Sequence, residues 1–202
     1  PQSLASLVHV LLRTRGFAPA HNQRGRVLAL LHRDEDAVTA YEAFLKLAPN
    51  DRSARIGLAS CLTTLGRLTE ARALLDAVLA ESPTDSAALG NLGNLLLSEG
   101  DLAAARETFE RALALNPRAV ISFFNLGRAR DFTAGEPLIA QMQALVDDPQ
   151  LSIDERVALL FGLAKAFEDV GEADASFGYL QRGNQMRAAQ AQYTLETDRA
   201  LF

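Results

Sequence analysis

The chain has 202 residues, of which 49% are hydrophobic and 22% are charged, a composition typical of a folded protein rather than a disordered tail. Polar or charged residues interrupt every long apolar stretch, which excludes a membrane-spanning helix, and a single cysteine excludes a disulfide scaffold or a multi-cysteine zinc site. The net charge of −5 argues against a dedicated nucleic-acid binder.

Residues 1–17 carry an apolar helical pattern around Leu4, Leu7, Val8 and Leu11, which stops at Gly16. We expect either an N-terminal helix or a degenerate repeat in this segment. The sequence starts without an initiator Met and without a signal-peptide pattern, so we expect a fragment of a larger cytoplasmic protein.

An interval of 34 residues recurs along the next part of the chain. It separates Pro49 from Pro83 and Pro83 from Pro117, and it also separates Gly66 from Gly100. Proline does not continue a helix and glycine allows a tight turn, so the shared period predicts a repeating pair of helices.

The window 86–119 shows the unit most clearly. Two apolar stripes at helical spacing run through Leu89, Leu92, Gly93 and Leu96 and then through Leu102, Ala105, Phe109 and Ala112. The turn Glu99-Gly100-Asp101 separates them, and Asn116-Pro117 ends the second helix. Small residues at the crossing allow the two helices to approach closely, with large residues filling the space beside them.

This alternation of small and large residues resembles the tetratricopeptide repeat. The family usually has Trp at the position of Leu89 and Tyr at that of Leu96, and both are Leu here. Residues 52–85 match in the same register. Residues 18–51 match more weakly, because their first helix carries Arg24 and Gly25 where Leu and Gly are expected.

The pattern diverges after Pro117. In residues 120–149 a first helix with Gly127 on its packing face is followed by a longer turn, and Pro137 opens the second helix of this divergent hairpin. Ser152 and Glu155 predict a capping box at the start of the next hairpin, residues 150–190.

The last helix carries Phe177 and Leu180, which we expect on its buried face. Residues 191–202 continue this helix beyond the length that a repeat needs. Because each hairpin alone leaves an apolar face exposed, neighbouring hairpins must stack. We predict an all-α fold, a right-handed α-α superhelix (TPR solenoid) of about five hairpins with an N-terminal helix, a long C-terminal helix and no sheet.

Residues 120–202 also contain a more specific set of sequence runs: 130–137 (RDFTAGEP), 148–152 (DPQLS), 162–171 (GLAKAFEDVG) and 182–184 (RGN). Together they resemble the repeat region that precedes the catalytic domain of bacterial tetratricopeptide-repeat sulfotransferase proteins. That resemblance implies a neighbouring domain that uses phosphoadenosine phosphosulfate. The chain has no glycine- and serine-rich phosphate loop, so we expect no cofactor and no catalysis from it.

The resemblance places the first helix of each hairpin along a concave groove. Asn side chains both donate and accept hydrogen bonds, basic residues can hold a carboxylate, and Phe side chains can form an apolar pocket. The candidate peptide-binding residues are Ser60, Asn91, Asn94, Phe124, Asn125, Arg128, Phe161 and Lys165. The same pattern of polar residues is also typical of a solvent-exposed helix face that binds no ligand.

The sequence offers few other candidates for metal-binding or catalytic residues. His9, His21 and His32 lack the spacing of metal ligands, so we expect no metal site, and Cys61 is expected to be a buried, inert thiol. The acidic run 34–36 suits a helix N-terminus.

The leading hypothesis is a non-catalytic interaction scaffold for a peptide or protein, including an acidic one, with no nucleic-acid or membrane partner. One alternative is the substrate-positioning part of a sulfotransferase whose catalytic domain lies outside this chain. The other is self-association as a homodimer through the N-terminal or the C-terminal helix.

Overall fold

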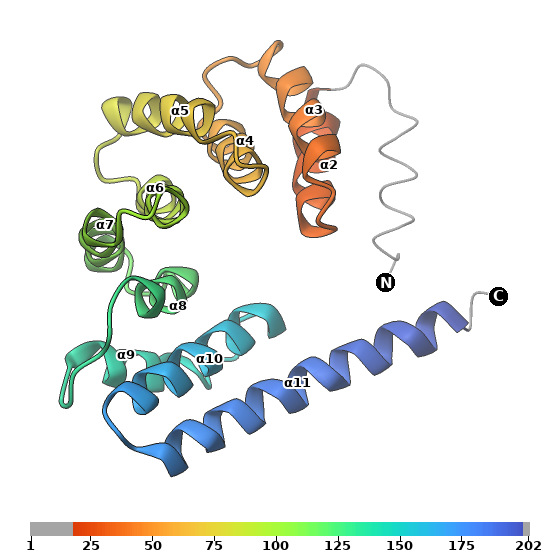
Figure 1. Cartoon of the computed structure of the whole chain (residues 1–202). Coiled ribbons are helices and arrows are strands. Elements are labelled where there is room, and N and C mark those ends of the chain that lie inside the picture. The colour runs from red at the N-terminus through yellow and green to blue at the C-terminus, as the bar shows by residue number, and fades with distance from the viewer. Residues whose placement is uncertain (1–17, 200–202) are drawn as a thin grey trace. The chain divides into compact units, whose positions relative to one another are not determined.

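The computed structural model describes residues 18–199, with side chains from residue 21 to residue 190 (Figure 1). This part of the chain forms ten helices and no strand. The prediction of an all-α fold with a long C-terminal helix is confirmed for it, and none of its helices is long and apolar enough to cross a membrane. The predicted helix within residues 1–17, and His9 with it, lie outside the described residues.

The chain divides into two compact units, Pro1–Asp101 and Leu102–Phe202. The described part of the first unit contains five helices that follow one another through short turns: α2 (Ala18–Leu30), α3 (Asp34–Leu45), α4 (Arg52–Thr64), α5 (Leu68–Glu81) and α6 (Ser86–Glu99). Each packs against the next, and α4 also contacts both α2 and α6. The alternate helices α2, α4 and α6 therefore lie in one layer, as expected for stacked hairpins.

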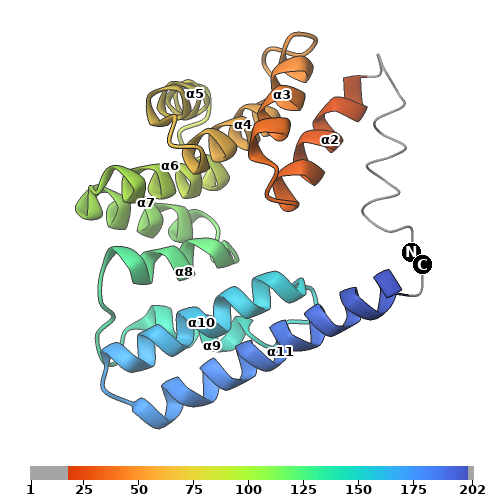
Figure 2. The same cartoon turned by 45° about the vertical axis from the view of Figure 1, so that its right-hand side comes forward.

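The second unit is built on the same plan, with a longer connection in its middle. It contains α7 (Leu102–Leu115), α8 (Val120–Ala129), α9 (Pro137–Leu145), α10 (Ile153–Asp169) and α11 (Ala173–Arg199). Helix α8 packs against α7 and α10, and α10 packs against α9 and α11 (Figure 2). At 27 residues, α11 is the longest helix of the described chain.

Tyr41 explains the small residues at the start of the first unit. Its side chain is 3% exposed, and a Cβ added at Gly25 or Gly57 would come within 2.8 Å or 2.6 Å of it. The two glycines therefore make room for one ring from α3 between α2 and α4. Gly25 provides the close contact expected of a repeat, even though the rest of this repeat matches weakly.

Several helix ends are capped by side chains, and some of these caps were predicted from the sequence. Asp51 and Asp85 stand at equivalent positions of successive repeats, and the Oδ1 of each accepts a hydrogen bond from the third backbone N–H of the helix it caps, at 2.8 Å and 2.9 Å. The capping box of Ser152 and Glu155 is present at the start of α10, and Pro137 occupies the first turn of α9. Asp34, Glu35 and Asp36 lie in the first turn of α3, where their negative charges interact favourably with the positive end of the helix dipole.

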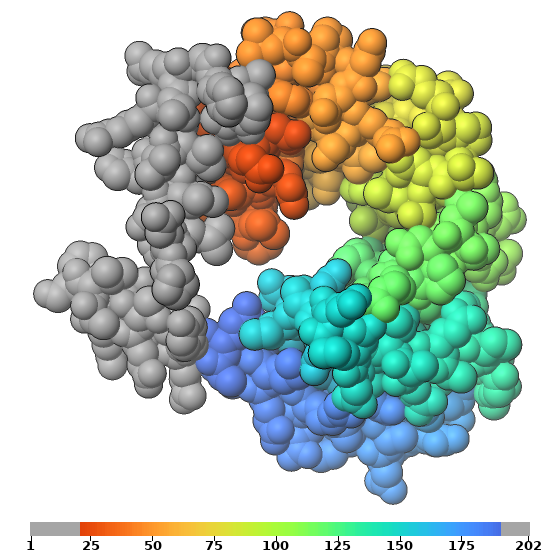
Figure 3. Space-filling view, turned by 180° about the vertical axis from the view of Figure 1, so that it is seen from behind, coloured from red at the N-terminus to blue at the C-terminus, as the bar shows by residue number. Residues whose placement is uncertain are grey.

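The structure contradicts the prediction for the buried face of α11. Phe177 is 66% exposed and Leu180 is 40% exposed, whereas Ser176 and Gly183 are buried. A Cβ at Gly183 would come within 2.8 Å of the Phe161 ring, so the glycine leaves room for that ring from α10. Figure 3 shows α10 and α11 as adjoining cyan and blue surfaces. Ser176 and Gly183, together with Tyr179 stacked on the Phe167 ring, face α10 in place of Phe177 and Leu180.

Several turns between consecutive helices contain a residue in the left-handed conformation. Gly66, Gly100 and Gly171 have φ values of +75°, +84° and +81°, which glycine adopts without cost. His32 occupies the corresponding position in the first hairpin of the described chain, one repeat before Gly66, and has a φ of +54°. It is the only non-glycine residue with positive φ among the described residues, and this conformation is strained for an L-residue.

We expect His32→Gly to raise the free energy of unfolding by about 0.5–1 kcal/mol, because relief of left-handed strain outweighs the added flexibility of glycine in the unfolded chain. Urea unfolding followed by circular dichroism measures the change. His32→Ala is the control and should give no gain, since alanine keeps the strain. Equal stabilisation by both substitutions would show that the backbone conformation is not the cause.

Candidate functional site

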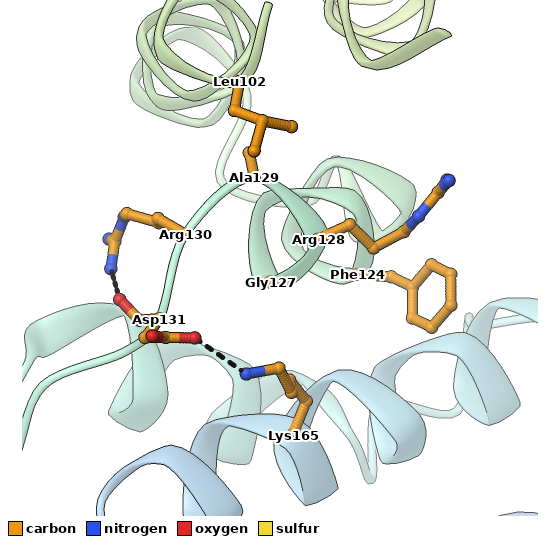
Figure 4. A pocket seen from close by; sticks show the side chains of 8 residues that line it. All are labelled: Leu102, Phe124, Gly127, Arg128, Ala129, Arg130, Asp131 and Lys165. Atoms are coloured by element: carbon orange, nitrogen blue, oxygen red, sulfur yellow. Dashed lines mark hydrogen bonds and ion pairs between the residues drawn. The ribbon is translucent and has the colours of Figure 1, made fainter. Parts of the chain in front are cut away.

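A pocket of about 680 Å³ lies in the second unit, at the end of α8 (Figure 4). Its lining comes from the first residue of α7, the last turns of α8, the start of the following loop and one residue of α10. The lining residues are Leu102, Phe124, Gly127, Arg128, Ala129, Arg130, Asp131 and Lys165. Its size is in the range of ordinary ligand pockets.

Two glycines allow α8 and α10 to approach each other beside this pocket. A Cβ at Gly162 on α10 would contact the backbone of Phe124 at 3.6 Å. At Gly127 on α8, a Cβ would meet the Phe132 ring at 3.1 Å and the Lys165 stem at 3.4 Å. The absence of side chains at these positions therefore places the Lys165 stem and the buried Phe132 ring against the end of α8.

Lys165 connects the loop after α8 to α10. Its ammonium forms ion pairs with Asp131 at 3.1 Å and with Asp169, which lies one turn further along α10. Partial burial opposes the charged ammonium, but hydrogen bonds to Asp169 and Asp131 outweigh that effect and raise the pKa of Lys165. Asp169 also accepts a hydrogen bond from the backbone N–H of Phe132 at 3.0 Å, so it holds the loop directly.

Arg130 forms a second ionic cluster in the same loop. Its guanidinium pairs with Glu136 and, at 3.2 Å, with Glu110 of α7, and it lies 5.1 Å from the centre of the Phe132 ring. Hydrogen bonds from Arg130 lower the pKa of Glu136. Arg130 also donates to the carbonyl of Asp131 at 2.9 Å. The loop is thus tied to α7 and α10 and braced within itself before any ligand is bound.

Arg128 differs from the other two basic residues of the pocket. Its side chain is exposed, and it forms no ion pair with any carboxylate in the described part of the chain. It makes one long hydrogen bond, 3.4 Å, to the Oδ1 of Asn125. In Figure 4 it extends to the right, beside Phe124, while Asp131 and Lys165 form their ion pair on the other side.

The structure thus brings Phe124, Arg128 and Lys165 together in one pocket, with Asn125 buried behind Arg128. Phe161 packs elsewhere, against Gly183 of α11 and with the Arg187 guanidinium 5.3 Å from its ring centre. Phe161 is therefore not among the residues that line the pocket of Phe124. Sequence reasoning missed the role of Asp131, although it precedes Lys165 by one repeat length.

The remaining predicted groove residues belong to the first unit. Ser60 is exposed on α4, and the amide of Asn91 donates to the Ala87 carbonyl of its own helix at 2.9 Å. Asn94 is half-buried on α6. None of these three residues lines the pocket at the end of α8.

Cys61 is 2% exposed, and burial raises the pKa of its thiol to about 12, with further contributions from Asp34. A thiol that stays protonated at neutral pH is a poor nucleophile, in agreement with the expected inert, buried side chain. Within the described residues, no group of three or more His, Cys, Asp or Glu side chains could hold a metal ion.

Comparison with known proteins agrees with this architecture. Two family models, both described as tetratricopeptide repeat, match residues 22–86 and 66–126. Together these matches cover all of α3 to α7. The chain is a tetratricopeptide-repeat protein. The predicted fold class is confirmed, and neither family model links the chain to sulfotransferase proteins.

Solved structures of other tetratricopeptide-repeat proteins share the fold. A thermophilic TPR protein from Thermus thermophilus is similar with a TM-score of 0.64 and 18% identity, over 92% of this chain and 99% of the other. MamA from Desulfovibrio magneticus RS-1, from residue 41 to its end, has a TM-score of 0.51 and 19% identity, over 93% and 85%. A further MamA structure has a TM-score of 0.53 and 20% identity, over 84% and 97%. No curated protein matches this repeat protein in sequence.

The two carboxylates that hold Lys165 should differ in their effect on stability. The side chain of Asp169 is 8% exposed and bonds both the ammonium and the loop backbone, whereas that of Asp131 is 85% exposed. We expect Asp169→Ala to lower the free energy of unfolding by about 2–3 kcal/mol and Asp131→Ala by about 0.5 kcal/mol or less. Urea unfolding measures both variants, and equal losses would contradict this account of the loop.

Proposed function

We propose that this tetratricopeptide-repeat protein is a non-catalytic interaction module that holds a peptide or protein segment in the pocket at the end of α8. The observation that carries the proposal is the pairing of an exposed, uncompensated Arg128 with the half-buried Phe124 ring in one pocket of about 680 Å³. Phe124 offers apolar surface, and Arg128 offers a charged hydrogen-bond donor. The tetratricopeptide fold supports the proposal, because the family resemblance implies peptide binding along the first helices of the hairpins.

The ligand carboxylate is assigned to Arg128 rather than to Arg128 and Lys165 together. Lys165 is engaged with Asp131 and Asp169, and separating it from them would leave the 8%-exposed Asp169 without its ion pair. Lys165 therefore acts as part of the pocket wall. An acidic or C-terminal group on the ligand would bind at the Arg128 side.

The relation of residues 120–202 to sulfotransferase proteins stays a proposal that rests on the sequence runs alone. In that reading the module positions an acceptor for a catalytic domain elsewhere in a longer protein. The coding sequence beyond residue 202 distinguishes the two readings. A strand followed by a glycine- and serine-rich loop and a helix would support a sulfotransferase partner domain.

Binding can be tested with a phage-displayed library of random dodecapeptides, selected against the whole chain. We expect Arg128→Ala to weaken the selected peptides at least tenfold in fluorescence anisotropy, because a charged hydrogen bond is lost. Arg106→Ala, at an exposed arginine of α7 away from the pocket, is the matched control and should leave the affinity unchanged. Peptides that bind both variants equally would show that this pocket is not the binding site.

Self-association through α11 is a second candidate, favoured by the exposed Phe177 and Leu180 side chains. In this reading the mass measured by sedimentation velocity rises with protein concentration, and Phe177→Gln abolishes the rise. The control is Leu115→Gln, at a leucine that is 46% exposed at the end of α7, and it should leave the rise in mass unchanged. A mass of one chain at all concentrations would exclude the homodimer.

A further inference from the structure

The side of the pocket formed by the loop after α8 carries an excess of negative charge. Lys165 is shared between Asp131 and Asp169, and Arg130 is shared between Glu110 and Glu136. Two basic side chains thus meet four carboxylates. Each cluster retains one negative charge after its basic residue is counted, so an approaching ligand meets a wall that favours cations.

Asp131 is the carboxylate that presents this charge to the pocket. Its side chain is 85% exposed and lines the cavity, whereas Asp169 is 8% exposed and Glu136 is 13% exposed. Glu110 is 44% exposed but does not line the pocket. With the buried carboxylates already engaged, Asp131 retains open space for a second cation beside Lys165.

Arg128 presents the opposite charge. It has no carboxylate partner in the described chain, and it lies on the other side of the pocket from Asp131 in Figure 4. Between the two charges lie Gly127 and Ala129, the 49%-exposed Leu102 of α7 adds apolar surface to the lining, and Phe124 lies beside Arg128 (Figure 4). The pocket therefore has a negative end, an apolar middle and a positive end.

We propose that this pocket selects a segment of mixed charge, in which an apolar side chain lies between a carboxylate that pairs with Arg128 and a lysine or arginine that pairs with Asp131. The proposal rests on the proposed peptide-binding function and specifies the chemistry of the ligand. A purely acidic segment would place a carboxylate against Asp131, and a purely basic one would place a cation against Arg128. Like charges at either position disfavour both alternatives.

The experiment uses the same phage-displayed dodecapeptide library, with the selected pools read by deep sequencing. Pools from the unmodified chain should be enriched, relative to the input library, in peptides that carry both an acidic and a basic residue near an apolar one. Asp131→Lys should reduce the enrichment of Lys and Arg at least threefold and keep that of Asp and Glu. Arg128→Glu should do the reverse.

Two further variants separate recognition from folding. Asp131→Asn removes the charge with little change of shape and should also reduce the enrichment of Lys and Arg, with an unchanged circular dichroism spectrum. Asp147→Lys alters another exposed carboxylate, 74% exposed and paired with Arg182 at 2.9 Å, that does not line the pocket. It should leave the selected pools as they are.

The outcomes distinguish this inference from the function on which it rests. Enrichment of acidic residues alone by the unmodified chain, or unchanged Lys and Arg enrichment in both Asp131 variants, overturns the mixed-charge proposal and leaves peptide binding intact. If the unmodified chain selects peptides no more strongly than the Phe124→Ala variant does, both the mixed-charge proposal and peptide binding at this pocket are overturned. Loss of basic residues in the Asp131 variants and of acidic residues in Arg128→Glu supports both.

Discussion

The close approach of α8 to α10 is the constraint on which the pocket depends. Gly162 lets the two backbones meet at Phe124, and Gly127 accepts the Phe132 ring and the Lys165 stem in the space of its missing side chain. A Cβ at Gly162 would already contact Phe124, and one at Gly127 would crowd the Phe132 ring, so neither position leaves room for a large side chain between α8 and α10. Lys165 on α10 lies within 3.1 Å of Asp131 in the loop that follows α8.

Ion pairing then divides the basic residues of the pocket into two kinds. Arg130 and Lys165 are each held by two carboxylates, and their role is to fix the loop that closes one end of the cavity. Arg128 is left to interact with solvent or a ligand. Three cations in one pocket suggest an anion site at first sight, but the carboxylates that accompany two of them reverse the local balance of charge.

Much of the fold could be predicted from the sequence, because proline, glycine and apolar spacing act locally. The repeat period located the turns at Gly66 and Gly100, and the capping box at Ser152 follows from two residues three positions apart. The exposure of Phe177 could not be predicted in this way, because periodicity identifies an apolar face without showing whether another helix covers it. The packing of Gly183 against Phe161 and the stacking of Tyr179 on Phe167 show which face of α11 meets α10.

The candidate site was predictable in part for the same reason. Phe124, Arg128 and Lys165 were found by their positions within the repeat, whereas the charge balance of the pocket depends on Asp131 of the loop after α8, which pairs with Lys165 of the next hairpin. Because this ion pair joins two hairpins, the pocket cannot be moved as a single hairpin. Arg128 and Asp131, which form its two ends, come from one hairpin, whereas Lys165, which pairs with Asp131, comes from the next and Leu102 comes from α7. The segment from α7 to α10 is therefore the smallest that could carry every lining residue of this pocket into another repeat array.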